Sequence, residues 1–221
     1  MGEMFLESAG SASSSEAIAP DRRTRGRERR RNQVYEAAVA LIIDKGFDNT
    51  TMDDIAERAD VARGTVFNHF ARKAAFLDEW GARRRRRALD TIYSEHLEDH
   101  SLREVLERYM IELAEISTRT RTETVALMGA SVHAINVLEN PPLAAELGSI
   151  LARARKDGRL APGVDPRLGG LLLASGYFAT LTAWIVEEPA PFALRSQLVS
   201  MVNIVLDGIL LPDRSGDAAG G

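Results

Sequence analysis

Cysteine is absent from the chain, and histidine occurs only four times. Without cysteine there is no disulfide framework, no thiolate nucleophile and no cysteine-bound metal site. The histidines are scattered, and the sequence contains no GxSxG, P-loop or dinucleotide-binding glycine motif. We therefore expect no enzyme activity, no catalytic residues, no cofactor and no metal site. The lack of cysteine is compatible with a reducing compartment, so we expect a cytoplasmic protein.

Strand patterns are missing as well. No segment alternates apolar and polar residues, and apolar residues instead recur every three or four positions. This pattern predicts an all-α fold with about nine helices. The start of the chain has no apolar core flanked by basic residues, so we expect no secretory signal. Ser, Ala, Gly and acidic residues dominate 1–21 and 212–221, which we expect to be disordered tails.

Charge is missing from one long segment, residues 168–186, which is close in length to a membrane span. Gly169, Gly176 and Ala183 recur in it every seven residues and give a helix one face of small side chains. Such a face lets another helix approach closely, and two threonines dilute the apolar content. We therefore interpret the segment as a helix that packs on other helices, and we expect no membrane partner.

The segment 51–73 is predicted to form a helix, a three-residue turn and a short second helix. Thr51 can cap the first helix together with Asp54, and an apolar stripe then runs to Ala59. Residues 60–62 are too few for anything except a tight turn. The segment therefore has the organisation of a helix-turn-helix unit.

The short second helix carries side chains that can reach a base edge or a phosphate. Val66 and Phe70 are four residues apart and point inward. The outer face holds Arg63, Thr65, Asn68 and His69. A helix with small and hydrogen-bonding side chains on its outer face fits a DNA major groove. A solvated surface helix is the alternative, and it receives less weight because a third helix supports the pair.

The third helix covers about residues 27–45, where apolar residues form one stripe and Gly46 provides a left-handed end. Three helices then close around one small core. The run from Arg30 to Trp80 resembles the N-terminal domain of the TetR family of transcriptional regulators. The matching motifs are Lys45-Gly46-Phe47, residues 50–56, residues 61–65, and His69-Phe70 with Lys73 beyond.

Three residues depart from the family's usual pattern. Ala62 stands where the family has Ser or Thr, so the second helix lacks a side-chain cap. Phe67 replaces a tyrosine whose hydroxyl commonly donates to phosphate. Asn68 replaces an aromatic residue or histidine, and it can make a bidentate contact to adenine. The operator sequences of relatives therefore do not transfer to this chain.

Charge is distributed unevenly along the chain. Residues 22–87 contain 17 Lys and Arg against 10 Asp and Glu, a net charge of +7, although the whole chain carries −4. The run 22–31 has seven arginines, and we interpret it as an arm on the DNA backbone or minor groove, with a disordered tail as the alternative. The residues predicted to contact DNA are Arg29, Arg30, Arg31, Thr51, Arg63, Gly64, Thr65, Phe67, Asn68, His69 and Lys73.

A second arginine run, residues 83–87, lies on the next predicted helix and cannot be buried on every side. We interpret it as an exposed helix face supported by pairs of Glu79 with Arg83 and Arg86 with Asp90. A phosphate contact by one or two of these arginines stays open as an alternative.

Everything after Trp80 is predicted to be helical. Ser101 with Glu104, and Thr120 with Glu123, have the spacing of capping boxes. We expect a DNA-binding domain with its basic arm at residues 22–73, and an effector-binding and dimerisation domain at residues 74–211.

The last predicted helix, from about Phe192 to Leu210, is apolar on more than one face and must be covered on more than one side. A second subunit is the simplest cover, and the resemblance implies a dimer formed by the last two helices in a four-helix bundle. The predicted interface residues are Gly169, Gly176, Ala183, Leu198, Met201, Val202, Val205 and Ile209.

Such a dimer presents two recognition helices about 34 to 36 Å apart and should bind a palindromic operator in double-stranded DNA. The resemblance implies a repressor that a small ligand releases. Candidate ligand-binding residues form a mostly apolar set, and each has the alternative of being an ordinary core residue. They are Tyr109, Met128, His133, Asn136, Tyr177, Thr180 and Trp184.

Two other interpretations of the sequence remain. His96 and His100 are four residues apart, a spacing that can hold a metal, but a hydrated helix end is the preferred interpretation. The alternative functions are a helical enzyme that binds a small molecule, and a regulator that activates or acts without a ligand. A helical adaptor would leave the basic N-terminal third without a purpose.

Overall fold

The computed structural model describes residues 22–97, 100–134 and 141–209. Over these residues the chain forms nine α-helices, which confirms the predicted all-α fold. The helices are α1 Arg22–Lys45, α2 Met52–Arg58, α3 Arg63–His69, α4 Ala74–Ser94, α5 Leu102–Arg119, α6 Arg121–Ala134, α7 Pro142–Lys156, α8 Pro166–Ile185 and α9 Leu194–Ile209. The two segments for which we predict disordered tails lie outside the described residues.

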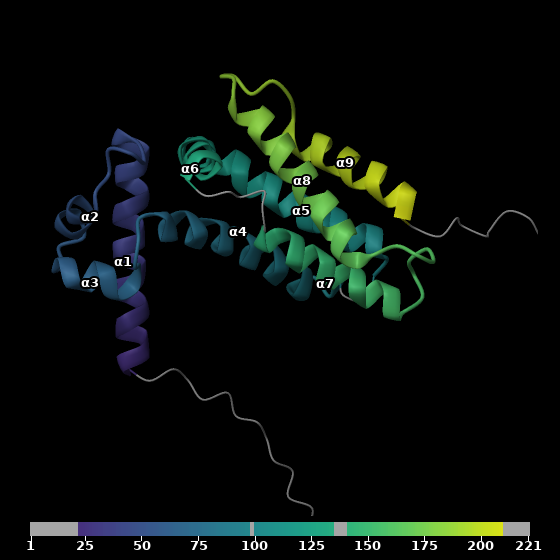
Figure 1. Ribbon diagram of the computed structural model, residues 1–221, viewed down its shortest axis with the longest axis horizontal. Coiled ribbons are helices and arrows are strands. Elements are labelled where there is room, and N and C mark those ends of the chain that lie inside the picture. Colours follow the sequence, from purple (N-terminus) through teal and green to yellow (C-terminus); the bar gives the residue numbers. More distant parts are fainter. Residues whose placement is uncertain (1–21, 98–99, 135–140, 210–221) are drawn as a thin grey trace, which may run out of the picture.

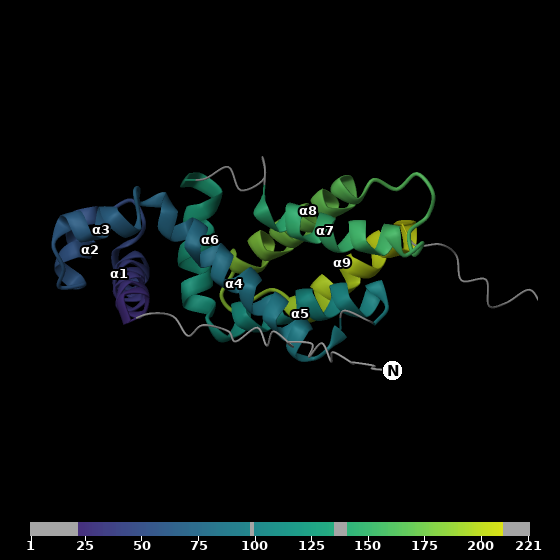
Figure 2. The same ribbon diagram turned by 90° about the horizontal axis from the view of Figure 1, so that it is seen from below.

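Helices α1, α2 and α3 form a small unit at one end of the molecule, and α4 leads from this unit into the remaining helices (Figure 1). We call residues 22–73 the head and residues 74–209 the body. In the perpendicular view, α6 lies between the head and the bundle of α5, α7, α8 and α9 (Figure 2). The body therefore meets the head through α4 and α6, which both contact α1.

Local sequence signals set the boundaries of the head helices. Gly46 ends α1 with a φ of 85°, a left-handed conformation that costs glycine little. Thr51 and Asp54 form the predicted capping box at the start of α2. The turn between α2 and α3 contains Asp60 with a φ of 49°. Asp is among the few residues other than Gly that tolerate this region.

The head encloses one apolar core. Val34 of α1, Ile55 of α2 and Val66 of α3 are fully buried, and Val61 packs against them at the corner between α2 and α3. These residues come from the apolar stripes of the sequence, so burial of the stripes stabilises the three-helix unit.

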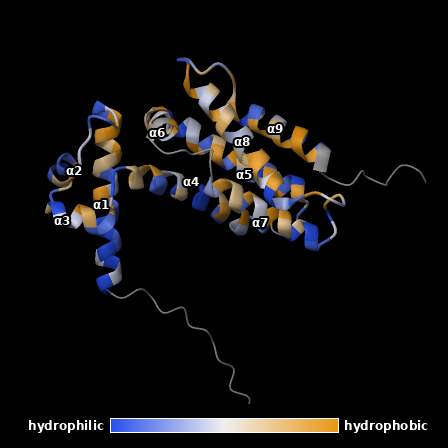
Figure 3. Cartoon of the chain, in the orientation of Figure 1, coloured by the Kyte–Doolittle hydropathy of each residue, from blue (hydrophilic) through white to orange (hydrophobic). Residues whose placement is uncertain are grey.

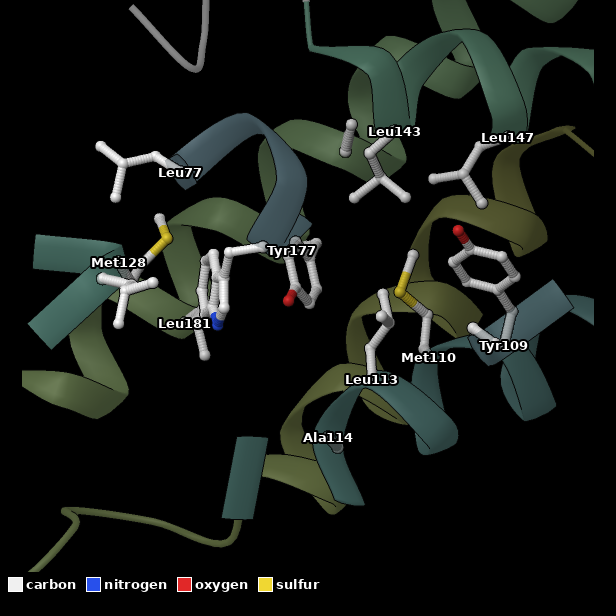
Figure 4. Close-up of a cluster of buried hydrophobic side chains, with 14 of the residues drawn as sticks. Leu77, Tyr109, Met110, Leu113, Ala114, Met128, Leu143, Leu147, Tyr177 and Leu181 are labelled. Carbon is white, nitrogen blue, oxygen red and sulfur yellow. The ribbon is translucent and has the colours of Figure 1, made fainter. Parts of the chain in front are cut away.

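The core of the body is built around α5 and α8. Figure 4 shows Met110 and Leu113 of α5 near Leu143 of α7, with Tyr177 of α8 beside them. Helices α7 and α8 approach each other very closely, because a Cβ atom on Gly170 would collide with the backbone of α7. Glycine in α8 therefore serves a contact inside the chain.

The uncharged segment forms α8, which is long and apolar enough to cross a membrane but is partly buried against other helices. Its small residues do not all face outward as the predicted dimer face requires. Gly169 is buried beside Leu151 of α7, and a Cβ on Gly176 would meet Met201 of α9 in the same chain. Ala183 is exposed.

The last helix is covered within its own chain, which corrects part of the predicted interface. Helix α9 packs against both α5 and α8, and Leu198 and Val202 are fully buried there. A second subunit is therefore not needed to cover Leu198 and Val202, because α5 and α8 of the same chain bury them. Met201 and Val205 are half-buried, and the side chain of Ile209 lies outside the described residues.

One of the two predicted capping boxes in the body forms. Ser101 and Glu104 cap α5 as predicted. The Thr120 hydroxyl instead donates to the Ile116 carbonyl, and Glu123 accepts a hydrogen bond from Trp80 of α4 at 2.8 Å. The sequence has the spacing of a capping box, but Glu123 binds Trp80 of another helix.

Candidate functional site

One face of the head carries most of the side chains predicted to contact DNA. On α3, Gly64, Phe67 and Asn68 are exposed, whereas Thr65 and His69 are half-buried. Phe67 is 40% exposed, which is unusual for so large an apolar side chain. The outer face of α3 therefore offers both hydrogen-bonding groups and an apolar group, and the latter can contact a thymine methyl.

Arg63 is held in place at the start of α3. Its Nε lies 3.1 Å from a carboxylate oxygen of Asp53 on α2, and its guanidinium carbon lies 5.5 Å from the centre of the Phe67 ring. Thr51 is exposed at the start of α2, where its hydroxyl oxygen accepts from the Asp54 amide. These contacts orient Arg63 and leave the Thr51 hydroxyl proton available to an acceptor outside the chain.

The departures from the family pattern have structural effects in α3. Helix α3 begins after Ala62 without a side-chain hydrogen bond to its first turn, as the sequence predicts.

At the other end of α3, burial together with the nearby Arg27 and Arg31 lowers the pKa of His69 below its usual 6.5. Both effects favour the neutral form of the His69 imidazole.

Two residues predicted to contact DNA are engaged inside the protein. Arg31 donates to the His69 carbonyl at 2.8 Å and to the Glu79 carboxylate at 2.7 Å. Lys73 donates to the Phe47 carbonyl through its ammonium, which also lies 4.3 Å above the Phe47 ring. These contacts tie α1 to α4 and support the loop before α2. They favour a structural role for both cations.

The basic run at the start of α1 is helical, which corrects the expectation of an arm. Helix α1 begins at Arg22, five residues before the predicted start, so Arg29 and Arg30 lie well inside the helix. All side chains from Arg22 to Arg30 are exposed. Figure 3 shows this end of α1 as a hydrophilic extension of an otherwise apolar helix. The run is a basic helical surface next to α3.

The second arginine run joins helices to one another. Arg83 donates to Glu79 at 2.9 Å, which confirms the predicted pair. It also donates to Asn32 of α1 at 2.7 Å, and its guanidinium carbon lies 3.7 Å from the centre of the Tyr35 ring. Arg83 therefore fastens α4 of the body to α1 of the head.

Arg84 is buried, with 6% of its surface exposed. Its guanidinium donates to the hydroxyls of Ser117, Thr120 and Thr124 and lies over the Trp80 ring. Within the described part of the chain, Arg84 forms no ion pair with a carboxylate. The negative end of α5 and the three hydroxyls partly compensate the buried charge.

The other arginines of the run differ from one another. Arg85 donates to Glu146 of α7 at 2.8 Å, and Arg87 lies 3.5 Å from Glu112 of α5. Arg86 is exposed, and the predicted pair with Asp90 is not among the ion pairs of the described residues. The interpretation of the run as one exposed face therefore holds for Arg86 but not for Arg84.

Most of the candidate ligand-binding residues are core residues. Tyr109, Tyr177 and Trp184 are buried, and Thr180 is half-buried. None of these four lines a described cavity. The side chain of His133 and all of Asn136 lie outside the described residues. Met128 is the candidate that lines a described cavity.

That cavity lies between the head and the body and has a volume of about 470 Å³. Phe70 and Arg31 of the head contribute to its wall, and Trp80, Met128 and Phe178 of the body form an apolar part. We call it the junction cavity. A second cavity of about 190 Å³, the outer cavity, lies farther along α4 and α7. Sequence spacing gave no sign of either, because each wall combines residues far apart in the chain.

No group of three or more metal-ligating side chains occurs among the described residues. His96 follows the end of α4 with a φ of 54°, so it does not share a helix with His100. The helical spacing that suggested a metal pair is therefore not formed.

Comparison with known proteins identifies relatives of the head and of the whole chain. Residues 34–80 match the family model described as bacterial regulatory proteins, tetR family. This match places the DNA-binding head of the chain with those of the TetR family. The HTH-type transcriptional repressor KstR of Rhodococcus jostii is 27% identical over 201 residues, covering 87% of this chain and 91% of that protein.

Solved structures of transcriptional repressors have the same fold as this chain. Thermus thermophilus FadR, a TetR-family repressor solved in complex with lauroyl-CoA, aligns with a TM-score of 0.67 at 27% identity. The alignment covers 86% of this chain and all of FadR. SmeT, the repressor of a Stenotrophomonas maltophilia multidrug efflux pump, aligns with a TM-score of 0.61 at 22% identity, over 83% and 91% of the two chains. These similar proteins are all transcriptional regulators.

Proposed function

We propose that the protein is a dimeric transcriptional repressor that binds a palindromic operator and is released by a small, mostly apolar ligand. The observation that carries this proposal is the exposed face of α3, where Arg63 is oriented by Asp53 beside Asn68 and Phe67. Donors on the outer face of a short helix in a basic head have the chemistry of major-groove recognition.

The basic end of α1 supplies binding that does not depend on sequence. Its arginines from Arg22 to Arg30 are exposed, and arginine neutralises phosphate and releases counterions from DNA. In this proposal α3 reads bases while α1 holds the head on the backbone. Arg31 and Lys73 position the head without contacting DNA.

A second copy of the chain is the proposed cover for the exposed apolar face of α8 and α9. Leu168 and Leu172 of α8 are 55% and 50% exposed, Val186 directly after α8 is 73% exposed, and Ile204 of α9 is 76% exposed. Apolar side chains exposed along one helix in this way are characteristic of an interface. In this proposal the exposed face takes the place of the predicted interface residues that are buried within the chain. A twofold dimer through this face would place two heads on one operator.

The junction cavity is the proposed effector site. Its wall includes Phe70 of the head and Met128 of the body, so a bound molecule contacts both parts. A ligand that binds one arrangement of head and body more tightly shifts the population toward that arrangement. FadR, which is similar in fold and sequence, is solved with lauroyl-CoA, and this supports an apolar effector for the present chain.

The place of action in this proposal is the cytoplasm, where the operator DNA lies. We propose no membrane partner, because the exposed apolar residues of α8 are assigned to the dimer. An activator would use the same DNA-binding face. Repression is favoured over activation and over enzyme activity because the named similar proteins are repressors.

The test is the binding of Arg63→Ala and Thr65→Ala to DNA from the upstream region of the protein's own gene. Each substitution is expected to weaken specific binding by about 1 to 3 kcal/mol in fluorescence anisotropy. The matched control is Arg155→Ala, which removes an exposed arginine of α7 far from the head. Unchanged affinity in both α3 variants, with helicity intact, would count against the assignment.

A further inference from the structure

Among the described residues, one polar side-chain contact joins α4 to α7, and it lies between the junction cavity and the outer cavity. Arg85 of α4 donates its Nε hydrogen to Oε1 of Glu146 on α7 at 2.8 Å. Arg85 lines the junction cavity, and Glu146 lines the outer cavity. The ion pair therefore lies between the junction cavity and the outer cavity.

A third residue binds this ion pair. The Tyr109 hydroxyl of α5 donates to Oε2 of Glu146 at 2.9 Å, so both carboxylate oxygens are used. Figure 4 shows Tyr109 beside Leu147, one position along α7 from Glu146. We call Arg85, Tyr109 and Glu146 the polar bridge.

The two ends of the polar bridge lie on helices that pack mainly on different neighbours. Helix α4 packs mainly on α5 and α6, whereas α7 packs mainly on α8. Arg85 and Glu146 retain 17% and 29% of their side-chain exposure, so water reaches the pair. Glu146 can therefore turn toward solvent and keep its own charge hydrated, whereas the less exposed Arg85 would be left without a partner.

Movement of Glu146 away from Arg85 and Tyr109 leaves two donors without an acceptor. These donors determine which chemical group a ligand must supply. Tyr109 is fully buried, and its hydroxyl would lose its acceptor when Glu146 turns away. Burial and the Glu146 carboxylate both raise the pKa of Tyr109, so the hydroxyl stays protonated and must donate. Arg85 would also lose its counterion. A ligand that replaces Glu146 at low cost needs an anionic oxygen group that accepts from both residues.

We infer that the effector is an acidic amphiphile whose anionic group takes the place of the Glu146 carboxylate on Arg85 and Tyr109, with its apolar chain in the junction cavity. The inference rests on the proposed function only for the effect on DNA binding, because the exchange on the polar bridge is a property of the body. A bound ligand replaces the contact of α7 with Arg85 on α4 by its own contact with Arg85. Because α4 leads from the head into the body, a change at Arg85 can reach the head.

The probe is decanoate, with decanol as the neutral molecule of the same chain length, and binding is measured by calorimetry without DNA. Glu146→Gln keeps an acceptor for Tyr109 but removes the competing charge from Arg85. This variant is expected to bind decanoate roughly tenfold more tightly than the wild type and to bind decanol equally. Arg85→Met is expected to lose the preference for decanoate over decanol.

Matched controls locate both ends of the ligand. Arg153→Met removes an arginine at the outer cavity that is not part of the polar bridge, and it should leave the decanoate preference unchanged. Ala82→Phe fills the junction cavity and should weaken binding of both probes, whereas Ile150→Phe fills the outer cavity and should not. The double variant Arg85→Met with Glu146→Gln leaves no unpaired charge and controls for folding.

Several outcomes overturn the inference. They are no decanoate binding by the wild type and by Glu146→Gln, no tightening in Glu146→Gln, and a decanoate preference that survives in Arg85→Met. Loss of the preference in Arg153→Met, or sensitivity to Ile150→Phe but not to Ala82→Phe, assigns the ligand elsewhere and also overturns it. Failure of the proposed function is separate, because a protein that binds decanoate as expected but no DNA would contradict only the regulator.

Discussion

The two arginine-rich runs of this chain, residues 22–31 and residues 83–87, have different surroundings. From Arg22 to Arg30 every side chain is exposed. In the second run Arg83, Arg84, Arg85 and Arg87 all contact side chains of other helices. The difference arises from the position of each helix. The start of α1 extends beyond the neighbouring helices, whereas α4 runs between the head and the other helices of the body. A run of like charges therefore indicates a binding surface only where the fold leaves it without partners.

The two runs meet at one carboxylate. Glu79 accepts a hydrogen bond from Arg31 at the end of the first run and from Arg83 at the start of the second. Arg31 is the last arginine of the first run, and it binds groups of the protein itself. The boundary between DNA-binding and structural arginines falls between Arg30 and Arg31.

The largest effect is expected for Arg84, the most deeply buried arginine. Arg84→Ala should lower the free energy of unfolding by about 3 kcal/mol, because it leaves a cavity and removes hydrogen bonds to three hydroxyls. Arg84→Met fills most of that space without a buried charge, and should cost less than about 1 kcal/mol. Denaturation in urea, followed by the fluorescence of the neighbouring Trp80, measures both.

The control for this experiment lies in the same run. Arg86→Ala removes an exposed arginine and should change stability by no more than about 0.5 kcal/mol. Equal losses at both positions would mean that the two arginines have similar surroundings, and the second run would then be uniform.

A smaller effect is expected for Glu79→Gln, which weakens the contact of both runs at once. It should lower the free energy of unfolding at pH 7 by about 2 kcal/mol, because two charge-assisted hydrogen bonds become weaker. Burial alone would raise the pKa of Glu79, but hydrogen bonds from Arg83 and Arg31 outweigh it and hold the pKa below its usual 4.5.

The sign of the pH dependence follows from this lowered pKa. The stabilisation by Glu79 is fully present above pH 4.5 and is lost as the pH falls below that value toward the pKa in the folded protein. The stability difference between wild type and Glu79→Gln should therefore shrink on acidification. A difference that stays constant between about pH 6 and pH 3 would show that the carboxylate charge is not involved.

The smallest effect on stability, and a clear effect on DNA binding, is expected for the exposed run. Replacing Arg22, Arg23, Arg25 and Arg27 with Gln should change the free energy of unfolding by less than about 0.5 kcal/mol. Affinity should fall for all DNA sequences alike, and the slope of log affinity against log salt should decrease by about 0.9 for each phosphate that is no longer neutralised. Anisotropy titrations at several salt concentrations give this slope, and an unchanged slope would place these arginines away from DNA.

The features that the sequence predicted correctly depend on neighbours along the chain. The capping box of Thr51 and Asp54 spans three residues, and the left-handed Gly46 depends on its own backbone. The apolar stripes of α1, α2 and α3 were sufficient to predict the head, because the helical repeat decides which side chains share a face.

The features that the sequence did not predict depend on partners far away in the chain. Arg31 meets Glu79 across 48 residues, and Arg85 meets Glu146 across 61 residues. Nothing in the local spacing distinguishes Arg31 from Arg30, or Arg84 from Arg86. The ligand site could not be predicted for the same reason, since the junction cavity combines side chains of the head with side chains near the end of the body.

The continuity of α1 has a consequence for its basic end. Because Arg22 to Lys45 form one helix of 24 residues, about 36 Å long, the direction of each arginine is fixed by its count of residues from the core. A flexible arm would tolerate an insertion or deletion, since it can find the phosphates again. In this helix, one residue inserted before Asn32 would turn all the preceding arginines by about 100° around the axis. The spacing of the run from the core, as much as its charge, is therefore part of what this chain must preserve to hold DNA.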